Sequence, residues 1–235
     1  PFALDAYTSL RAGADARERV RLVWRPDPTQ PGVVLLHNTV FALYHRDVFA
    51  LDAQTGALRW AYVSPNDLAG VSVVRAGLVV VDDRGGASLL APDDGRARWR
   101  QSLPGAGPQA VLQLPADFSP TPNTDDPPRT LVQSLLEAAG GSDARLLPAQ
   151  RFAAQSLAAL PGAPATAALV SLLTRRALSP ELRAVVGEGL VGRTEGTDAM
   201  LEALDQHYDY VRGVDVPPVG FLARALARAH ERRAV

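Results

Sequence analysis

The stretch Phe49-Ala50-Leu51-Asp52-Ala53-Gln54-Thr55-Gly56-Ala57-Leu58-Arg59-Trp60 decides the fold of the first half of the chain, because it occurs again in altered form. A second copy runs Leu89-Leu90-Ala91-Pro92-Asp93-Asp94-Gly95-Arg96-Ala97-Arg98-Trp99. The interval from Gly56 to Gly95 equals the interval from Trp60 to Trp99. A shorter copy, Phe2-Ala3-Leu4-Asp5-Ala6-Tyr7-Thr8, opens the chain. A fixed period of about 39 residues is typical of folds that stack one structural unit several times.

Each repeat contains the pattern of four short strands. The first repeat has apolar or alternating segments at 33–36, 40–44, 48–51 and 58–63, and the second at 71–74, 78–81, 87–90 and 96–100. Asp52, Thr55 and Gly56 form a turn signal, since Asp and Thr bond nearby backbone and Gly accepts positive φ. Four short strands per repeat are the content of one propeller blade. The opening copy supplies only part of a blade, with its tryptophan at Trp24 after an insertion at 11–20.

The pattern Ala50-x-Asp52-x-x-Thr55-Gly56-x-x-x-Trp60 resembles the tryptophan-docking motif of quinoprotein-type (PQQ-like) β-propellers, over residues 1–105. The resemblance implies that Trp60 and Trp99 pack between neighbouring blades. Quinone-using members carry eight blades, whereas this chain has sequence for two blades and part of a third, without a convincing set of Ca²⁺-ligating acids. Other members bind no cofactor and act as scaffolds, such as the propeller lipoprotein of outer-membrane protein assembly.

The second copy departs from the motif, since Ala91 replaces the Asp and Asp94 replaces the Thr. In the opening copy, Ser9 stands at the Gly position and Gly13 at the Trp position. Because that copy begins in the middle of a repeat unit, we expect the natural chain to continue upstream of Pro1.

The second half has the period of α-helices. Residues 115–129 contain five prolines and no apolar period, which indicates a linker or a loop that follows the surface. We expect helices at 131–139, 148–160, 164–176, from Ser179-Pro180, from Thr194 or Thr197, and from Pro217-Pro218 to Arg233. Paired short helices of this kind resemble HEAT-type α-solenoid repeats. The predicted fold is therefore multidomain, all-β plus all-α: propeller blades at 1–113, a Pro-rich linker at 114–129 and a HEAT-like domain at 130–235.

Bulk composition excludes several functions. The formal charge of −1 and the pI of about 6.5 argue against a general nucleic-acid binder, which needs a clustered basic face. With no cysteine there are no disulfides, thiolate metal sites or Cys nucleophiles. Apolar runs such as Gly77-Leu78-Val79-Val80-Val81 are far shorter than a membrane span.

One motif could indicate nucleotide binding. Gly187-Glu188-Gly189-Leu190-Val191-Gly192 matches the dinucleotide fingerprint, with Ala184-Val185-Val186 as a conceivable strand and Asp209 at a suitable distance for a ribose. Ser179-Pro180-Glu181-Leu182 instead indicates a helix start just before it. We favour the second interpretation, in which the glycines let two helices pack closely.

Three further groups have residue types that carry chemistry elsewhere. His45-Arg46-Asp47 matches part of a kinase catalytic loop but lacks the accompanying motifs, and a hairpin turn explains it better. The acids of Asp82-Asp83 and Asp93-Asp94 lack the spacing of a Ca²⁺ loop. In Asp205-x-His207-x-Asp209 a helix would turn the histidine away from both acids, which disfavours a metal site.

The sequence therefore predicts no catalytic, cofactor or metal residues. It predicts a non-catalytic scaffold that binds other protein subunits in a larger bacterial assembly, in the periplasm or otherwise at the cell envelope. Arg224, Arg228 and Arg232 form a helical stripe that could contact an acidic partner, although a solvated face is the simpler interpretation. Two alternatives stay open: a fragment of a quinone- or nucleotide-dependent oxidoreductase, and a sensor module that regulates a linked domain.

Overall fold

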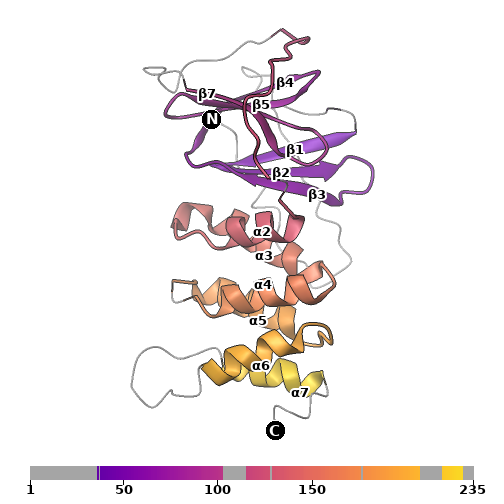
Figure 1. The fold of residues 1–235 in the computed structure, drawn as a ribbon. Coiled ribbons are helices and arrows are strands. Elements are labelled where there is room, and N and C mark those ends of the chain that lie inside the picture. Colours follow the sequence, from indigo (N-terminus) through magenta and orange to yellow (C-terminus); the bar gives the residue numbers. More distant parts are fainter. Residues whose placement is uncertain are drawn as a thin grey trace. The chain divides into compact units, whose positions relative to one another are not determined.

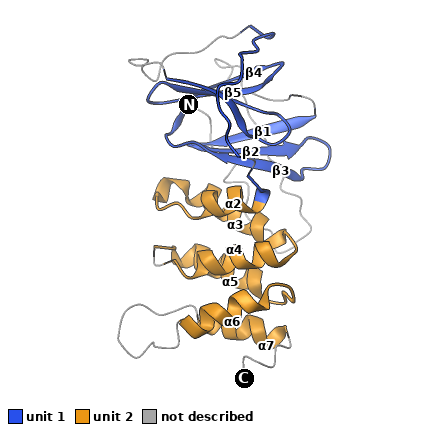
Figure 2. Ribbon diagram, in the orientation of Figure 1, with its two compact units in different colours: residues 1–131 blue, residues 132–235 orange. Residues whose placement is uncertain are grey.

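The computed structural model describes residues 36, 38–102, 115–127, 129–175, 177–206 and 219–229. The chain divides into two compact units, residues 1–131 and residues 132–235 (Figure 2). The opening copy with Trp24, the insertion at 11–20 and most of the strand predicted at 33–36 lie outside the described residues. Within the described residues, no helix has the length and apolar character needed to cross a membrane.

The described part of the first unit forms two antiparallel sheets of consecutive strands (Figure 1). The first sheet has the order β1-β2-β3, with β1 Thr39–Tyr44, β2 Asp47–Asp52 and β3 Leu58–Val63. The second has the order β4-β5-β6-β7, with β4 Leu68–Val74, β5 Gly77–Asp82, β6 Gly86–Leu90 and β7 Ala97–Ser102. The strands predicted within these ranges are confirmed, with small differences at their ends, and the arrangement is consistent with part of a β-propeller.

The backbone hydrogen bonds of the turns repeat with the same period as the sequence. After β2, the N–H of Asp52 donates to the carbonyl of Ala57 at 2.8 Å. After β6, the N–H of Ala91 donates to the carbonyl of Arg96 at 2.9 Å. The two donors, Asp52 and Ala91, are one full sequence period apart, and so are the two acceptors, Ala57 and Arg96. The turn geometry is thus retained although the motif's Asp has been replaced by Ala.

The glycines and strand irregularities repeat in the same way. Gly56 and Gly95 both have left-handed backbone conformations, with φ of +71° and +69°. The register shifts at Ala50/Leu51 in one sheet and at Leu89/Leu90 in the other, again one period apart. The strand pairing of the two sheets is therefore irregular at equivalent points of the repeat.

An apolar core joins the two sheets. It contains Phe41, Leu43, Val48, Ala50 and Trp60 from the first sheet and Leu78, Val80, Leu90 and Ala97 from the second. Trp60 is 3% exposed, and its indole Nε1 donates to the carbonyl of Pro92 at 2.8 Å. A Cβ atom on Gly95 would overlap the six-membered ring of Trp60. The indole of one sheet therefore lies directly on the bare backbone of the next, as the family resemblance implies for Trp60.

The chain passes from the first sheet to the second over the β1–β2 hairpin. His45, with φ of +50°, lies in this hairpin turn. The N–H of Ser64 donates to the carbonyl of Arg46 at 2.8 Å, and that of Leu68 to the carbonyl of His45 at 2.7 Å. The prediction that His45-Arg46-Asp47 forms a hairpin turn is confirmed, and the turn also fixes the start of β4.

The second unit is helical. Its helices are α2 Leu131–Ala139, α3 Leu147–Ala159, α4 Ala163–Leu173, α5 Pro180–Leu190, α6 Thr197–Gln206 and α7 Val219–Arg228, with a short 3₁₀ turn at Ala144–Leu146 before α3. The unit boundary falls within α2. Ser179 caps α5 as predicted, since its Oγ accepts from the N–H of Leu182 at 3.3 Å. The helix predicted at 164–176 ends earlier, at Leu173, where Thr174 Oγ1 bonds the Ser171 carbonyl.

Each helix from α3 to α7 packs mainly on helices that are adjacent to it in the sequence or one further along. Helix α3 packs on α4 and α5, α4 on α5 and α6, and α7 on α5 and α6. The fully buried leucines of the unit include Leu157, Leu169, Leu172, Leu182 and Leu190.

Arg193, just after α5, caps the C-terminal end of α3 through hydrogen bonds. Its guanidinium donates to the carbonyl oxygens of Leu157 (3.3 Å), Ala158 (2.8 Å), Leu160 (2.6 Å) and Gly189 (2.9 Å) and to the hydroxyl of Thr166 (3.1 Å). The last carbonyls of a helix have no partner within it and carry its negative dipole end, so a cation there stabilises the helix. Partial burial lowers the pKa of Arg193, and nearby Glu195 opposes this shift. Arg175 donates similarly to the Gly140 carbonyl, after α2, at 3.0 Å.

Gly95→Ala should destabilise the first unit by about 2–4 kcal/mol. The new methyl group must displace the Trp60 ring, and the alanine backbone must adopt a left-handed φ. Urea denaturation followed by tryptophan fluorescence measures the change. Gly56→Ala is the control, because Gly56 lies in the same unit and has φ of +71° but open space where a Cβ would lie. Equal costs for the two substitutions would contradict the packing of Trp60 on Gly95.

Arg193→Met should lower the stability of the second unit by about 2–4 kcal/mol, since it leaves the end carbonyls of α3 without their donor. Thermal unfolding followed by far-UV circular dichroism reports on this helical unit. Arg151→Met, at an exposed position of α3, should have little effect. If both variants unfold at the same temperature, Arg193 does not cap α3.

Candidate interaction surface

The structure contradicts the interpretation of residues 187–192 as a dinucleotide-binding loop. Helix α5 includes Ala184–Val186, so no strand precedes the glycines. A Cβ on Gly187 would overlap the ring of Phe221, and one on Gly189 would lie 2.6 Å from the Cβ of Ala158. The glycines let α7 and α3 approach α5 closely, which confirms the helix-packing interpretation.

The acidic candidates take part in turns. Asp82 accepts from the N–H groups of Arg84 at 2.9 Å and Gly86 at 2.7 Å, and Asp94 accepts from the N–H of Arg96 at 3.0 Å. Asp205 lies near the end of α6, whereas His207 and Asp209 lie outside the described residues. Across the part of the chain that the structure describes, no three potential metal ligands cluster together.

The predicted arginine stripe is only partly within the described residues. Arg224 and Arg228 are exposed on α7, opposite the buried Leu222 and Leu226, and Arg232 lies outside. Arg224 lies 3.4 Å from Glu188 Oε1 on α5, and its guanidinium is 5.6 Å from the centre of the Phe221 ring. An exposed pair of this kind contributes little to stability. A partner at Arg224 would have to replace this intramolecular pair.

The turn after β2 has a fixed shape and charge. Asp52 accepts from the N–H groups of Gln54 at 3.0 Å and Thr55 at 2.8 Å, and from Thr55 Oγ1 at 3.0 Å. It also pairs with the Arg59 guanidinium, which itself donates to Thr39 Oγ1 at 2.8 Å. The Arg59 bond, followed by the Thr55 N–H, holds the pKa of Asp52 well below its usual value. These bonds fix the shape of the turn, in which residues 53–57 are exposed.

The Pro-rich segment runs along the outer edge of β7. The N–H of Asn123 donates to the carbonyl of Arg98 at 3.0 Å. The Asn123 side chain accepts from the Arg100 N–H at 2.8 Å and donates to the Arg100 carbonyl at 2.7 Å. Thr124 Oγ1 donates to the Ala97 carbonyl, and Asp126 pairs with the Arg100 guanidinium at 2.6 Å. An edge strand with free N–H and C=O groups invites another chain, and this segment occupies those groups.

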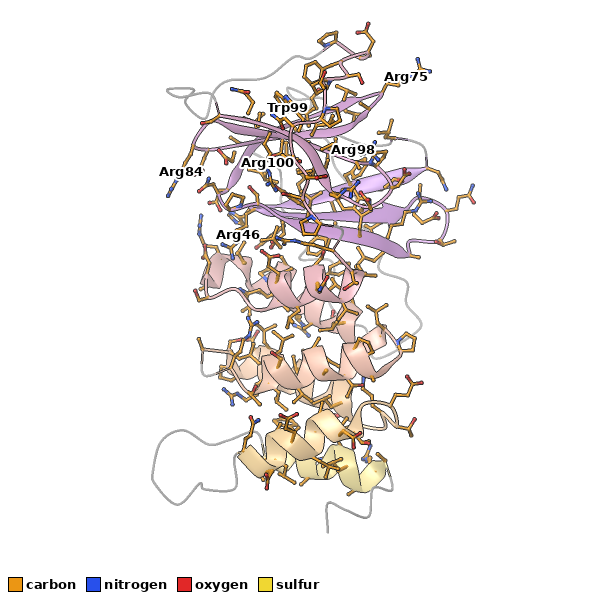
Figure 3. The ribbon with its side chains drawn as sticks, in the orientation of Figure 1. Arg46, Arg75, Arg84, Arg98, Trp99 and Arg100 are labelled. Carbon is orange, nitrogen blue, oxygen red and sulfur yellow. The ribbon has the colours of Figure 1, made fainter. Side chains whose placement is uncertain are left out.

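Trp99 has a different environment from Trp60. It is half-buried beside Val74, Val79 and Leu89, and its ring meets Phe118 of the Pro-rich segment edge-on, with centroids 5.9 Å apart. Arg98 and Arg100, the residues before and after Trp99 on β7, are exposed, and they point to the opposite face of the sheet from Trp99 (Figure 3). The family resemblance implies that Trp99 packs between blades; among the described residues, its aromatic contact is with Phe118 instead.

The first unit is therefore a repeated β-sheet module, in which a three-stranded and a four-stranded sheet share the same turn geometry and are joined through an indole. A family model described as "Outer membrane protein assembly factor BamB" matches residues 14–119. The match supports the PQQ-like repeats predicted in the first half of the chain.

Among solved structures, that of BamB from Moraxella catarrhalis is similar at 21% identity, over 28% of this chain and 20% of that chain, with a TM-score of 0.25. The matched part thus spans a fifth of the length of that protein. The search of curated proteins finds no match.

The Asp52 turn makes the stability of the first unit depend on pH. Because the pKa of folded Asp52 lies below its usual 3.8, its ion pair stabilises the fold above this value, and the contribution is lost as the pH falls below it. Acidification from about pH 5 to about pH 3 should therefore lower the urea midpoint more in the native chain than in Asp52→Asn. Asp83→Asn, at an exposed position of the next hairpin, should retain the native pH dependence. An unchanged dependence in Asp52→Asn would contradict this role.

Proposed function

We propose that this chain is a non-catalytic protein-interaction module of a larger assembly at a bacterial cell envelope, in the periplasm. The observation that carries the proposal is the repeated sheet unit at residues 38–102, within the region that the assembly-factor family model matches. Hydrogen bonds fix the shape of its exposed turns, and such preformed surfaces lose little entropy on binding a protein partner.

We also propose the division of the chain into modules. Residues 1–113 would be propeller blades, 114–129 a Pro-rich connection and 130–235 a HEAT-like array. Two observations support the last assignment. Helices pack on their neighbours and next neighbours, as expected where each repeat contacts only adjacent repeats. Arg175 and Arg193 each cap the end of a helix that lies well before them in the chain, and the two sequence separations, 35 and 33, are nearly equal.

The partners would be other protein subunits. In the first unit, the exposed Arg98 and Arg100 on β7 are the candidate contact residues, since arginine is enriched at protein interfaces. In the second unit, the stripe of Arg224, Arg228 and Arg232 would meet an acidic surface, with the Arg224–Glu188 pair opening to allow it.

Site-specific photo-crosslinking in the native organism tests the proposal. The crosslinking residue is placed at the exposed positions Arg84, Arg98 and Arg228, with buried Leu157 as the control. We expect a discrete adduct with an envelope protein from at least one exposed position and none from the control. A chain that is monomeric and gives no adduct from any position would contradict the proposal. Saturable binding of a quinone cofactor or a dinucleotide in calorimetry would also contradict it, in favour of an oxidoreductase.

A further inference from the structure

Residues 116–126, which we call the strap, are attached to the second sheet at three points. The Ala116 carbonyl accepts from the N–H of Arg75, in the turn between β4 and β5, at 2.8 Å. The Phe118 ring meets Trp99, and the last residues of the strap bond to β7. The strap therefore contacts both a face and an edge of the sheet.

The face of the second sheet that the strap contacts, its outer face, is apolar. In β5, Leu78 and Val80 belong to the core shared with the first sheet, whereas Val79 between them points to the outer face. An antiparallel sheet with a solvated face alternates apolar and polar side chains, but this sheet is apolar on both faces. The outer cluster consists of the buried Val74, Val79 and Leu89, with Ala76, Trp99 and Phe118 packed against them.

The strap also imitates a strand at the edge of β7. The side-chain amide of Asn123 accepts from the N–H of Arg100 at 2.8 Å and donates to the carbonyl of Arg100 at 2.7 Å. A residue of a neighbouring antiparallel strand makes this pair of bonds with its backbone. The N–H of Asn123 donates in addition to the Arg98 carbonyl at 3.0 Å. One asparagine thus satisfies three backbone groups of the edge.

The strap closes this edge and offers no new edge in its place. Pro120 and Pro122 have no N–H to donate, and proline at a sheet edge prevents the pairing of another strand. The bonds between Asn123 and Arg100 are exposed, as is the ion pair of Arg100 with Asp126. A segment held by few buried contacts opens at a lower free energy than the sheet beneath it.

We propose that the strap is a built-in cap that ends the stack of sheets and keeps two copies of the chain apart. When the strap opens, the outer face of the second sheet packs on the same face of a second copy. The inference goes beyond the proposed function and does not rest on it.

The composition of the uncovered surface favours a second copy as the occupant. The outer cluster has no charged member, and an apolar face is complementary to itself across a two-fold axis. Pairing of two β7 edges is disfavoured, because it would bring Arg98 and Arg100 of both copies together. Both arginines point away from the face that carries Trp99, so face-to-face packing avoids this repulsion.

Sedimentation velocity of the full chain over a range of concentrations tests the proposal. Phe118→Ser removes the ring that covers the outer face, and Asn123→Ala removes the imitation of a strand. Each substitution should tighten the association of two copies roughly tenfold or more, because the strap loses one of its attachments. Asp117→Ser is the matched control, since Asp117 is exposed in the same strap, and it should behave as the native chain does.

A double variant identifies the surface that associates. Phe118→Ser combined with Trp99→Gln also removes the largest apolar side chain of the outer cluster, so this variant should be monomeric again. Asn123→Ala changes only an exposed side chain, and its effect is therefore independent of packing within the sheet.

Three results would overturn the proposal. The first is that Phe118→Ser and Asn123→Ala both sediment as the native monomer. The second is association of Phe118→Ser that persists when Trp99 is also replaced, because the copies would then meet through another surface. The third is a native chain that already associates as strongly as the two variants, since the strap would then keep nothing apart.

Discussion

The indole of Trp60 lying on the backbone of Gly95 is the contact on which the first unit depends. The three-stranded and the four-stranded sheet each have an apolar face, and these two faces are buried against each other in one core. The flat indole fills the space beside the β6–β7 turn, and its N–H satisfies the Pro92 carbonyl that it would otherwise cover. The contact needs a residue without a side chain and with left-handed φ, and Gly95 meets both conditions. The bulges, turns and register of both sheets repeat around it.

The second unit joins its helices by a different means. Here the backbone groups that need partners are the end carbonyls of helices, and the donor is a charged guanidinium rather than an indole. Arg193 reaches three carbonyls at the end of α3 as well as Thr166 on α4, while Arg175 reaches the carbonyl after α2. In both units, a long side chain from one element therefore satisfies the backbone of another element that is distant in the sequence.

Much of this fold could be predicted because its signals are local. Gly56, Gly95 and their tryptophans fixed the period, and the apolar runs between turns located the strands. The glycine-rich segment after Val186 was correctly assigned to a helix because Ser179-Pro180 is a strong helix start. Other features depend on tertiary partners. The early end of α4 at Leu173, the caps made by Arg175 and Arg193, and the role of Asn123 on β7 require contacts that no sequence window contains. The one available signal, an arginine shortly after a helix, does not identify the carbonyls it will reach.

Hydrogen exchange of the Trp60 indole N–H, compared with the backbone amides of both sheets, tests the central claim most directly. If the indole couples the sheets into one unit, its N–H opens only when they separate. It should then exchange at the rate of the buried amides of Phe41 in the first sheet and Leu78 in the second. Rapid exchange of the Trp60 indole while those amides stay protected would show that each sheet is stable without the contact, and would contradict the account.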